Sequence, residues 1–356
     1  MCWKPKSLVL LLLVTRSLSA QSPQMPAAAA HQADPAPRLA PLTVDDSGHA
    51  ITTAQAWAGQ RVNLLRQWHA CMGEFPPAKA PLKSEIVTTE EFPDFVRQLV
   101  RYQIEDGVTT EAYLLTPKPA ARTFPAVVVF HQTTRTNIRQ AAGLDESKPE
   151  LNQGVQLVRR GYVVLCPRCF IFENGAYEAV GFARNVALMR QRHPDWTGLA
   201  RMTWDAVRAA DFLASLPHVD RARIGAIGHS LGAREALYAA AFDDRYRAVV
   251  FNEGGIDLHV SNWAQVWYLG PQILQPGFAL AHHQLLALIA PRAFLLLAGD
   301  AEDHDASRDF VEAARPVYRL FGAESNLGWF NHHAGHRYPP EARTMAEVFL
   351  DAQLKP

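Results

Sequence analysis

The chain has 356 residues, of which 48% are hydrophobic, and its 35 lysines and arginines are balanced by 35 aspartates and glutamates. A chain of this length and apolar content can bury a large core and still form one domain. Because the net charge is zero and no basic run stands out, the composition argues against nucleic acid as a partner.

The first twenty residues have the pattern of a secretory signal peptide. Two lysines precede an apolar run over residues 8–14, and the stretch from Ser17 to Ala20 offers small residues at the cleavage positions. The run is shorter than the roughly 20 residues that span a bilayer. We therefore expect cleavage after Ala20, export to the periplasm or the medium, and no membrane span in the mature chain.

Export raises the question of disulfides, because these form in oxidising compartments. The mature chain keeps an odd number of cysteines: Cys71, Cys166 and Cys169. Cys166 and Cys169 could close a small disulfide or be two buried structural cysteines. One such pair cannot supply a four-ligand zinc site.

After the signal peptide, residues 21–42 are rich in alanine and proline and predict a flexible leader. Apolar residues at helical intervals then predict an amphipathic helix over Ala54–Met72. Short apolar runs beyond it predict strands at 112–116, 125–130, 162–166, 223–228, 246–251, 293–298 and 326–330. Residues 153–160 are predicted to end a helix, and further helices are predicted at 202–216, 231–241 and 340–354. This alternation predicts one α/β domain over residues 43–356, with a mostly parallel sheet and helices on both faces.

The strand predicted at 223–228 ends in a G-x-S-x-G pattern, formed by Gly228, Ser230 and Gly232. An alanine-rich helix follows it, so the order is strand, tight turn, helix. That is the context of a nucleophile elbow, where a strained turn exposes a serine hydroxyl and the flanking glycines let strand and helix approach. Ser230 is therefore the predicted nucleophile.

A serine needs a base, and the base needs an orienting acid. In this architecture both follow the serine in the chain, the acid first and the histidine last. Among the late histidines we favour His336, because it lies in the loop between the last predicted strand and the terminal helix. His332 and His333 remain open as alternatives.

The acid is predicted in the loop that follows the strand at 293–298. Asp303 has the best reach back to the histidine, Asp305 is the next choice, and Asp300 is close to the strand end. Glu253 is a separate candidate, since it follows the preceding strand, at 246–251. The sequence does not decide among these carboxylates.

Such a nucleophile also needs two backbone amides aimed at the point where negative charge develops on the substrate oxygen. One is predicted at Leu231, after the nucleophile, and the other at Gln132, in the loop after the strand at 125–130. The adjacent His131 is predicted to be structural. A zinc hydrolase is the rival chemistry, because His304 and the late histidines lie near aspartates, but no H-E-x-x-H helix is present. We therefore expect no metal.

From about Glu91 to its end, the chain resembles the α/β-hydrolase superfamily, and within it the dienelactone-hydrolase-like and acetylxylan-esterase-like exported serine esterases. The resemblance rests on the motifs 130–134 (FHQTT), 161–164 (GYVV), 228–232 (GHSLG) and 335–336 (GH). Residues 252–255 (NEGG) and 261–263 (SNW) also look like bacterial members that include glucuronoyl esterases. The resemblance implies a serine–histidine–acid triad that works through an acyl-enzyme without a cofactor. Dienelactone hydrolases proper use a cysteine where this chain has Ser230.

The loops 170–201 and 253–283 are long enough to cover such a site. The second contains Trp263 and Trp267, whose flat faces could stack on sugar rings or pack a cap. The predicted function is hydrolysis of carboxylic esters, with acetyl or glucuronoyl carbohydrate esters as candidate substrates. A peptidase or lipase with the same triad, and a non-catalytic binding protein on the same scaffold, are the alternatives.

Overall fold

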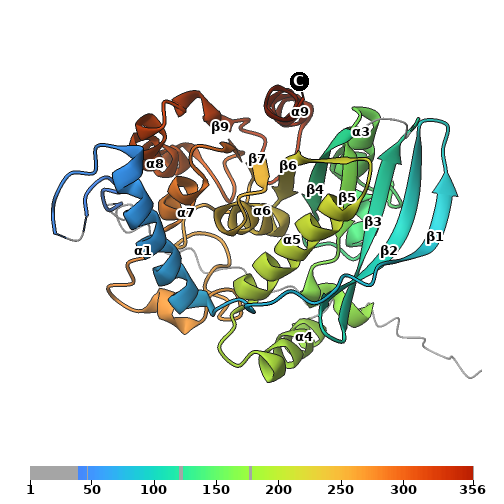
Figure 1. Cartoon of the computed structure of the whole chain (residues 1–356), viewed down its shortest axis with the longest axis horizontal. Helices are drawn as coiled ribbons and strands as arrows, with labels where there is room; N and C mark the ends of the chain where they lie inside the picture. Colours follow the sequence, from blue (N-terminus) through green and yellow to red (C-terminus); the bar gives the residue numbers. More distant parts are fainter. Residues whose placement is uncertain (1–38, 46, 120–122, 176–178, 356) are drawn as a thin grey trace, which may run out of the picture. The chain divides into compact units, whose positions relative to one another are not determined.

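The computed structural model describes residues 39–45, 47–119, 123–175 and 179–355. The predicted signal peptide and residues 21–38 of the predicted leader lie outside this part of the chain. The described residues all belong to one compact unit. Within it, nine strands of the described residues form a single sheet with helices on both faces (Figure 1). The predicted α/β class is confirmed.

The sheet has the strand order β1-β2-β3-β5-β4-β6-β7-β8-β9. The pairs β1–β2, β2–β3 and β3–β5 are antiparallel, and all pairs from β5 to β9 are parallel. The strands are β1 (Glu85–Glu91), β2 (Phe95–Glu105), β3 (Val108–Pro117), β4 (Phe124–Phe130), β5 (Val163–Pro167), β6 (Val219–His229), β7 (Tyr246–Asn252), β8 (Ala293–Ala298) and β9 (Leu327–Asn331). The carboxyl ends of the parallel strands meet at one edge, where ligands bind in open α/β sheets.

The helices bury both faces of the sheet. Side chains of α1, α4, α5, α6, α7 and α8 share one hydrophobic cluster with the first face, and α2, α3 and α9 share a second cluster with the other. The helices are α1 (Ala54–Met72), α2 (Ile138–Ala141), α3 (Gln153–Arg159), α4 (Ala179–Arg192), α5 (Gly198–Ser215), α6 (Leu231–Phe242), α7 (His282–Ile289), α8 (Arg308–Leu320) and α9 (Pro340–Leu354). Along β4, Val128 packs into the first cluster and Val127 and Val129 into the second. An uninterrupted apolar strand is therefore buried on both sides.

The amino-terminal helix α1 has the predicted bounds and buries Trp57 and Trp68, while Val62 is 65% exposed. Residues that precede this helix in the sequence also pack on the domain. Leu42 is buried in the first cluster, and the backbone oxygen of Ala40 accepts a hydrogen bond from Nε2 of His283 at 3.0 Å. Packing thus includes the last residues of the stretch that composition assigned to the leader.

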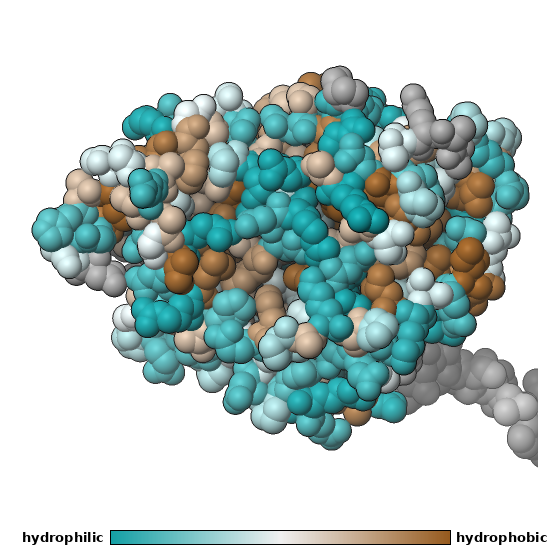
Figure 2. Space-filling model, in the orientation of Figure 1, coloured by the Kyte–Doolittle hydropathy of each residue, from teal (hydrophilic) through white to brown (hydrophobic). Residues whose placement is uncertain are grey.

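The three described cysteines, Cys71, Cys166 and Cys169, are free thiols. Cys166 and Cys169 are buried, and burial raises the pKa of the Cys169 thiol well above its usual value. The structure thus favours the expectation of two buried structural cysteines. Among the described helices, none is long and apolar enough to cross a membrane. Figure 2 shows hydrophilic residues over most of one face, with hydrophobic residues scattered among them.

Candidate active site

The predicted nucleophile lies at a strained turn between β6 and α6. Ser230 has φ 57° and ψ −121°, in the left-handed half of conformational space that side chains rarely adopt. A Cβ on Gly228 would lie 2.0 Å from the oxygen of Gly232, and a Cβ on Gly232 would lie 2.0 Å from the oxygen of Phe130. Both glycines are therefore required for strand, turn and helix to approach this closely, as the motif predicts.

The His336 imidazole lies between the serine and a carboxylate. Its Nε2 is 3.0 Å from Oγ of Ser230, and its Nδ1 is 3.3 Å from Oε2 of Glu253. These distances match a serine–base–acid arrangement. The two other late histidines bond elsewhere: Nδ1 of His332 accepts from a backbone amide, and Nδ1 of His333 faces an aspartate.

Glu253 is the residue directly after β7, and its side chain is fully buried. It has a φ of 52°, which sets this residue apart from the extended strand before it. Its oxygens accept hydrogen bonds from the backbone amides of Gly299 (2.5 Å), Glu302 (2.9 Å) and Asp303 (3.3 Å). These three donors replace the water that a buried carboxylate loses. The loop after β8 thus holds the carboxylate with its backbone.

Asp303, the first choice for the acid, bonds to other groups. Its fully buried carboxylate accepts from the amides of Gly255 (2.7 Å) and Ile256 (2.8 Å) and from Oγ of Ser307 (3.1 Å). Burial raises the pKa of Asp303 to about 6. The carboxylate beside the imidazole is Glu253 instead, so the structure corrects the preference for Asp303. Asp303 ties the loop after β8 to the segment that follows Glu253.

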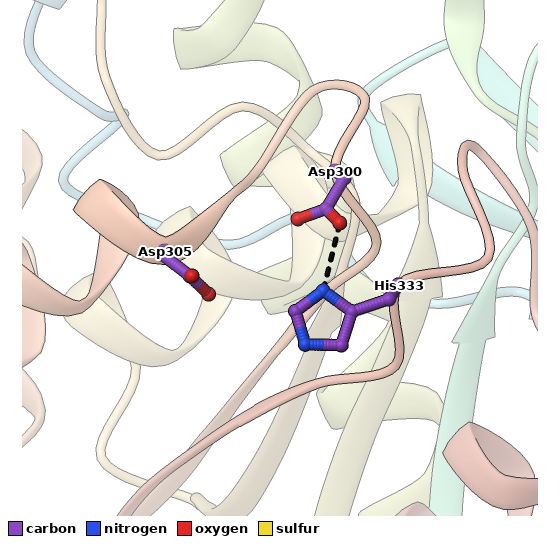
Figure 3. Close-up of side chains that lie close together, drawn as sticks. All are labelled: Asp300, Asp305 and His333. Carbon is purple, nitrogen blue, oxygen red and sulfur yellow. Dashed lines mark hydrogen bonds and ion pairs between the residues drawn. The ribbon is translucent and has the colours of Figure 1, made fainter.

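Asp305, the second choice, is exposed and belongs to a different cluster. It lies with Asp300 and His333, and the potential ligand atoms of the three are within 4.8 Å of one another (Figure 3). Nδ1 of His333 bonds to Asp300 at 2.7 Å, which raises the pKa of His333. Such side chains can hold a divalent cation. However, Asn331 directs its Nδ2 donor at both carboxylates, at 2.7 and 2.8 Å, and its oxygen accepts from the amide of His333. The two carboxylates are thus hydrogen-bonded without a cation.

The two amides predicted for the oxyanion hole lie just beyond the carboxyl ends of two neighbouring strands, β4 and β6. Leu231 is the first residue of α6, where helix amides lack intrahelical acceptors, and Gln132 follows β4, which pairs with β6. Within the described part of the chain, neither amide donates a backbone hydrogen bond. The side chain of Gln132 donates to Gln140 at 2.8 Å. Both amides are thus available to a substrate oxygen.

His131 has the structural surroundings that were expected. Burial lowers its pKa to about 4, so the ring is neutral near pH 7. Its Nε2 accepts from the amide of Cys169 at 3.2 Å, which leaves the Nδ1 proton to bond the oxygen of Gln132 at 2.8 Å. The imidazole therefore links the end of β5 to the loop that carries one predicted oxyanion donor.

The two tryptophans differ in their surroundings. Trp263 is fully buried, its Nε1 donates to the oxygen of Gly255 at 2.7 Å, and the Arg234 guanidinium lies 4.2 Å from its ring centre. A ring in this position cannot stack on a sugar, so the predicted contact of Trp263 with substrate is wrong. Trp267 is half-buried, and its ring stacks on Tyr268 at 3.8 Å.

Arg234 is a buried residue of the site that the motifs did not indicate. It lies one helical turn after the nucleophile on α6 and donates to the oxygen of Gly254 (2.8 Å), to Asn262 (2.5 Å) and to Ser261 (2.7 Å). The guanidinium thereby fastens the segment after Glu253 to the helix that begins at Ser230. Its position four residues after the serine was the only signal in the sequence.

Comparison with known proteins finds similarity to a family of hydrolases. Residues 110–266 match the dienelactone hydrolase family. YtaP of Bacillus subtilis (strain 168), which is assigned as a hydrolase, is 26% identical over 255 residues, covering 67% of this chain and 80% of YtaP.

Solved structures of other proteins have a similar fold over nearly the whole chain. The glucuronoyl esterase from Solibacter usitatus has a TM-score of 0.73 at 20% identity and covers 90% of this chain and 98% of its own. A CE15 glucuronoyl esterase from Teredinibacter turnerae T7901 has a TM-score of 0.69 at 24% identity, over 88% and 89% of the two chains. The chain therefore shares the α/β-hydrolase fold of these esterases, and its residues 110–266 are similar to the dienelactone hydrolase family.

Proposed function

We propose that the protein is an exported serine hydrolase that cleaves carboxylic esters through an acyl-enzyme. Ser230 is the nucleophile, His336 the general base and acid, and Glu253 the carboxylate that orients the imidazole. The observation that carries this proposal is the position of the His336 ring, 3.0 Å from the serine oxygen and 3.3 Å from the glutamate. A non-catalytic scaffold would have no need of that alignment.

The geometry supports a two-step reaction. Oγ of Ser230 attacks the ester carbonyl carbon while Nε2 of His336 takes its proton, and the carbonyl oxygen becomes an oxyanion held by the amides of Leu231 and Gln132. When the carbonyl re-forms, the bond to the alcohol breaks and His336 returns the proton to the alcohol. Water then attacks the acyl-enzyme by the same route and releases the acid. Glu253 stabilises the imidazolium in both steps.

We favour carbohydrate esters as the substrate class. Two of the structural neighbours are glucuronoyl esterases by name, and their similarity extends over most of this chain. Of the two predicted sugar-stacking residues, Trp267 is the one with an accessible surface. A peptidase or lipase would use the same triad, so substrate class has to be measured directly.

A fluorophosphonate probe tests the proposed nucleophile. We expect labelling of the wild type and of Ser215→Ala, a control whose hydroxyl donates to the backbone oxygen of Phe212. We expect no labelling of Ser230→Ala and strongly slowed labelling of His336→Ala. Equal labelling of Ser230→Ala would contradict the assignment, and an unlabelled wild type would favour a binding protein.

Two further measurements address substrate and export. The substrate class is tested by comparing kcat/KM for acetyl, glucuronoyl and feruloyl sugar esters with kcat/KM for a peptide and a triglyceride. We expect a sugar ester to have the highest value.

For export, we expect the mature protein outside the cytoplasm to begin at Gln21, as read by amino-terminal sequencing. Retention of the complete chain in the cytoplasm would contradict it.

A further inference from the structure

Asn252, the last residue of β7, contacts the chain at all three members of the proposed triad. Its backbone oxygen accepts from the amide of Ser230 at 2.9 Å, and it is bonded covalently to Glu253. Its side-chain Nδ2 donates to the backbone oxygen of Arg337, at 3.1 Å, and Arg337 directly follows His336. One fully buried residue thus connects the nucleophile turn, the acid and the histidine loop.

The same amide nitrogen also orients a second imidazole. Nδ2 of Asn252 donates to Nδ1 of His229 at 2.7 Å, so Nδ1 is the unprotonated nitrogen of that ring. His229 is the last residue of β6 and is buried, and its ring centre lies 4.6 Å from that of His336, with 38° between the ring planes. The His336 imidazole therefore rests against a flat ring that is itself held by Asn252.

Stability alone does not account for an amide at this position. Oδ1 of Asn252 is one of the buried oxygens in the described residues that have no hydrogen-bond partner. An unpaired buried oxygen costs about 1–3 kcal/mol. The side chain therefore keeps an unfavourable oxygen next to the nitrogen that bonds both Arg337 and His229.

The neighbouring imidazole is uncharged, which suits catalysis. Burial and the facing charges of His336, His332 and Lys148 lower the pKa of His229 to about 3, and only its interaction with the backbone of Asn252 acts in the opposite direction. At neutral pH, His229 thus presents a neutral ring when His336 becomes an imidazolium. A second positive charge 4.6 Å away would oppose that protonation.

We propose that Asn252 and His229 form a positioning pair, in which the Asn252 amide fixes the His336 loop and the His229 ring so that the His336 imidazole stays aligned between Ser230 and Glu253. The inference rests on the proposed hydrolase function and assigns these residues no contact with substrate. Because small misplacements of a catalytic group can cost about 100-fold in rate, such a pair acts on turnover more than on substrate binding.

The test compares Asn252→Leu with Gln103→Leu in hydrolysis of p-nitrophenyl acetate. Gln103 is a buried amide on β2 whose Nε2 donates to the oxygen of Pro81 at 3.0 Å, so its replacement removes a similar bond far along the sheet. We expect Asn252→Leu to lower kcat about 10- to 100-fold with KM within about twofold, and Gln103→Leu to leave both within about twofold. The melting temperature of each variant is measured alongside.

A second variant covers the case in which Asn252→Leu does not fold. His229→Phe keeps a flat ring beside His336 but cannot accept the Asn252 bond, and we expect its kcat to fall about 10-fold. If the variant that folds keeps kcat within twofold of the Gln103→Leu control, the positioning pair is overturned. Ser230→Ala separates failure of the positioning pair from failure of the proposed function. If Ser230→Ala keeps full activity, the proposed function on which the pair rests is overturned.

Discussion

The segments after β7 and β8 each carry a fully buried carboxylate, and the two carboxylates have different partners. Glu253, after β7, accepts three backbone amides and still faces the imidazole of His336. The oxygens of Asp303, after β8, accept from two amides and from the hydroxyl of Ser307. Backbone amides of the loop after β8 thus bind Glu253, and backbone amides of the segment after β7 bind Asp303. Burial at the carboxyl edge of the sheet therefore does not distinguish the two carboxylates, whereas contact with the histidine separates the proposed acid from the other.

The largest difference between the two acids is expected in turnover. Glu253→Gln keeps the shape of the side chain but removes the charge that orients and stabilises the imidazolium of His336. We expect kcat on p-nitrophenyl acetate to fall about 1,000- to 10,000-fold. A loss below tenfold in a folded variant would mean that Glu253 is not the acid of the triad.

The corresponding change after β8 is expected to act on stability. In Asp303→Asn, one of the two amides now bonded would face an N–H group instead of an oxygen. We expect unfolding in urea to become easier by about 1–3 kcal/mol, with kcat reduced less than about tenfold. A thousandfold loss of kcat at unchanged stability would restore Asp303 as the acid.

A third buried carboxyl, Glu235 on α6, shows what burial does without several backbone donors. Desolvation raises its pKa to about 8, from 4.5 in the unfolded chain. Between these values the folded protein keeps a proton that the unfolded chain releases, so the free energy of unfolding falls as pH rises, by up to about 1.4 kcal/mol per pH unit.

Glu235→Gln has no such proton and should therefore lose less stability than the wild type between pH 5 and pH 8. Urea titrations at several pH values measure both proteins. Parallel curves of the free energy of unfolding against pH would show that Glu235 is ionised in the folded state. The comparison between the two proteins cancels the contributions of the other titrating groups.

The smallest effect is expected at the exposed side of the loop after β8. The bond to Asp300 raises the pKa of His333, so Asp300→Asn should lower the midpoint of the His333 titration in NMR spectra. Because both groups are exposed, the melting temperature should hardly change. An unchanged His333 titration would show that the pair does not form in solution.

The sequence predicted those parts of the fold that rest on local patterns. The bounds of α1 and α9, the apolar strands β4 and β8 and the strained turn at Ser230 all follow from periodicity, composition and a short motif. The strands β1 and β2 did not emerge from the sequence. Most of β1 is exposed, and β2 buries the polar residues Arg97 and Gln103, so neither has the apolar pattern of an inner strand.

The site was predictable as a set of loops but not as a set of contacts. Chain order and loop position indicated His336, and they left Glu253 and Asp303 both open. What separates the two is the turn at Glu253, where a φ of 52° sets the residue apart from the strand before it, and no local pattern reports that angle. Trp263 failed as a prediction for a similar reason, since its buried ring packs against Arg234 and His282, which are distant in the sequence.

The most direct test of which carboxylate orients the imidazole is to observe the proton on Nδ1 of His336. In a ¹H NMR spectrum, a proton in a histidine–carboxylate hydrogen bond gives a far-downfield signal, which His336→Ala assigns by its loss. We predict that the signal persists in Asp303→Asn and disappears in Glu253→Gln. A signal that survives in Glu253→Gln and is lost in Asp303→Asn would contradict the account.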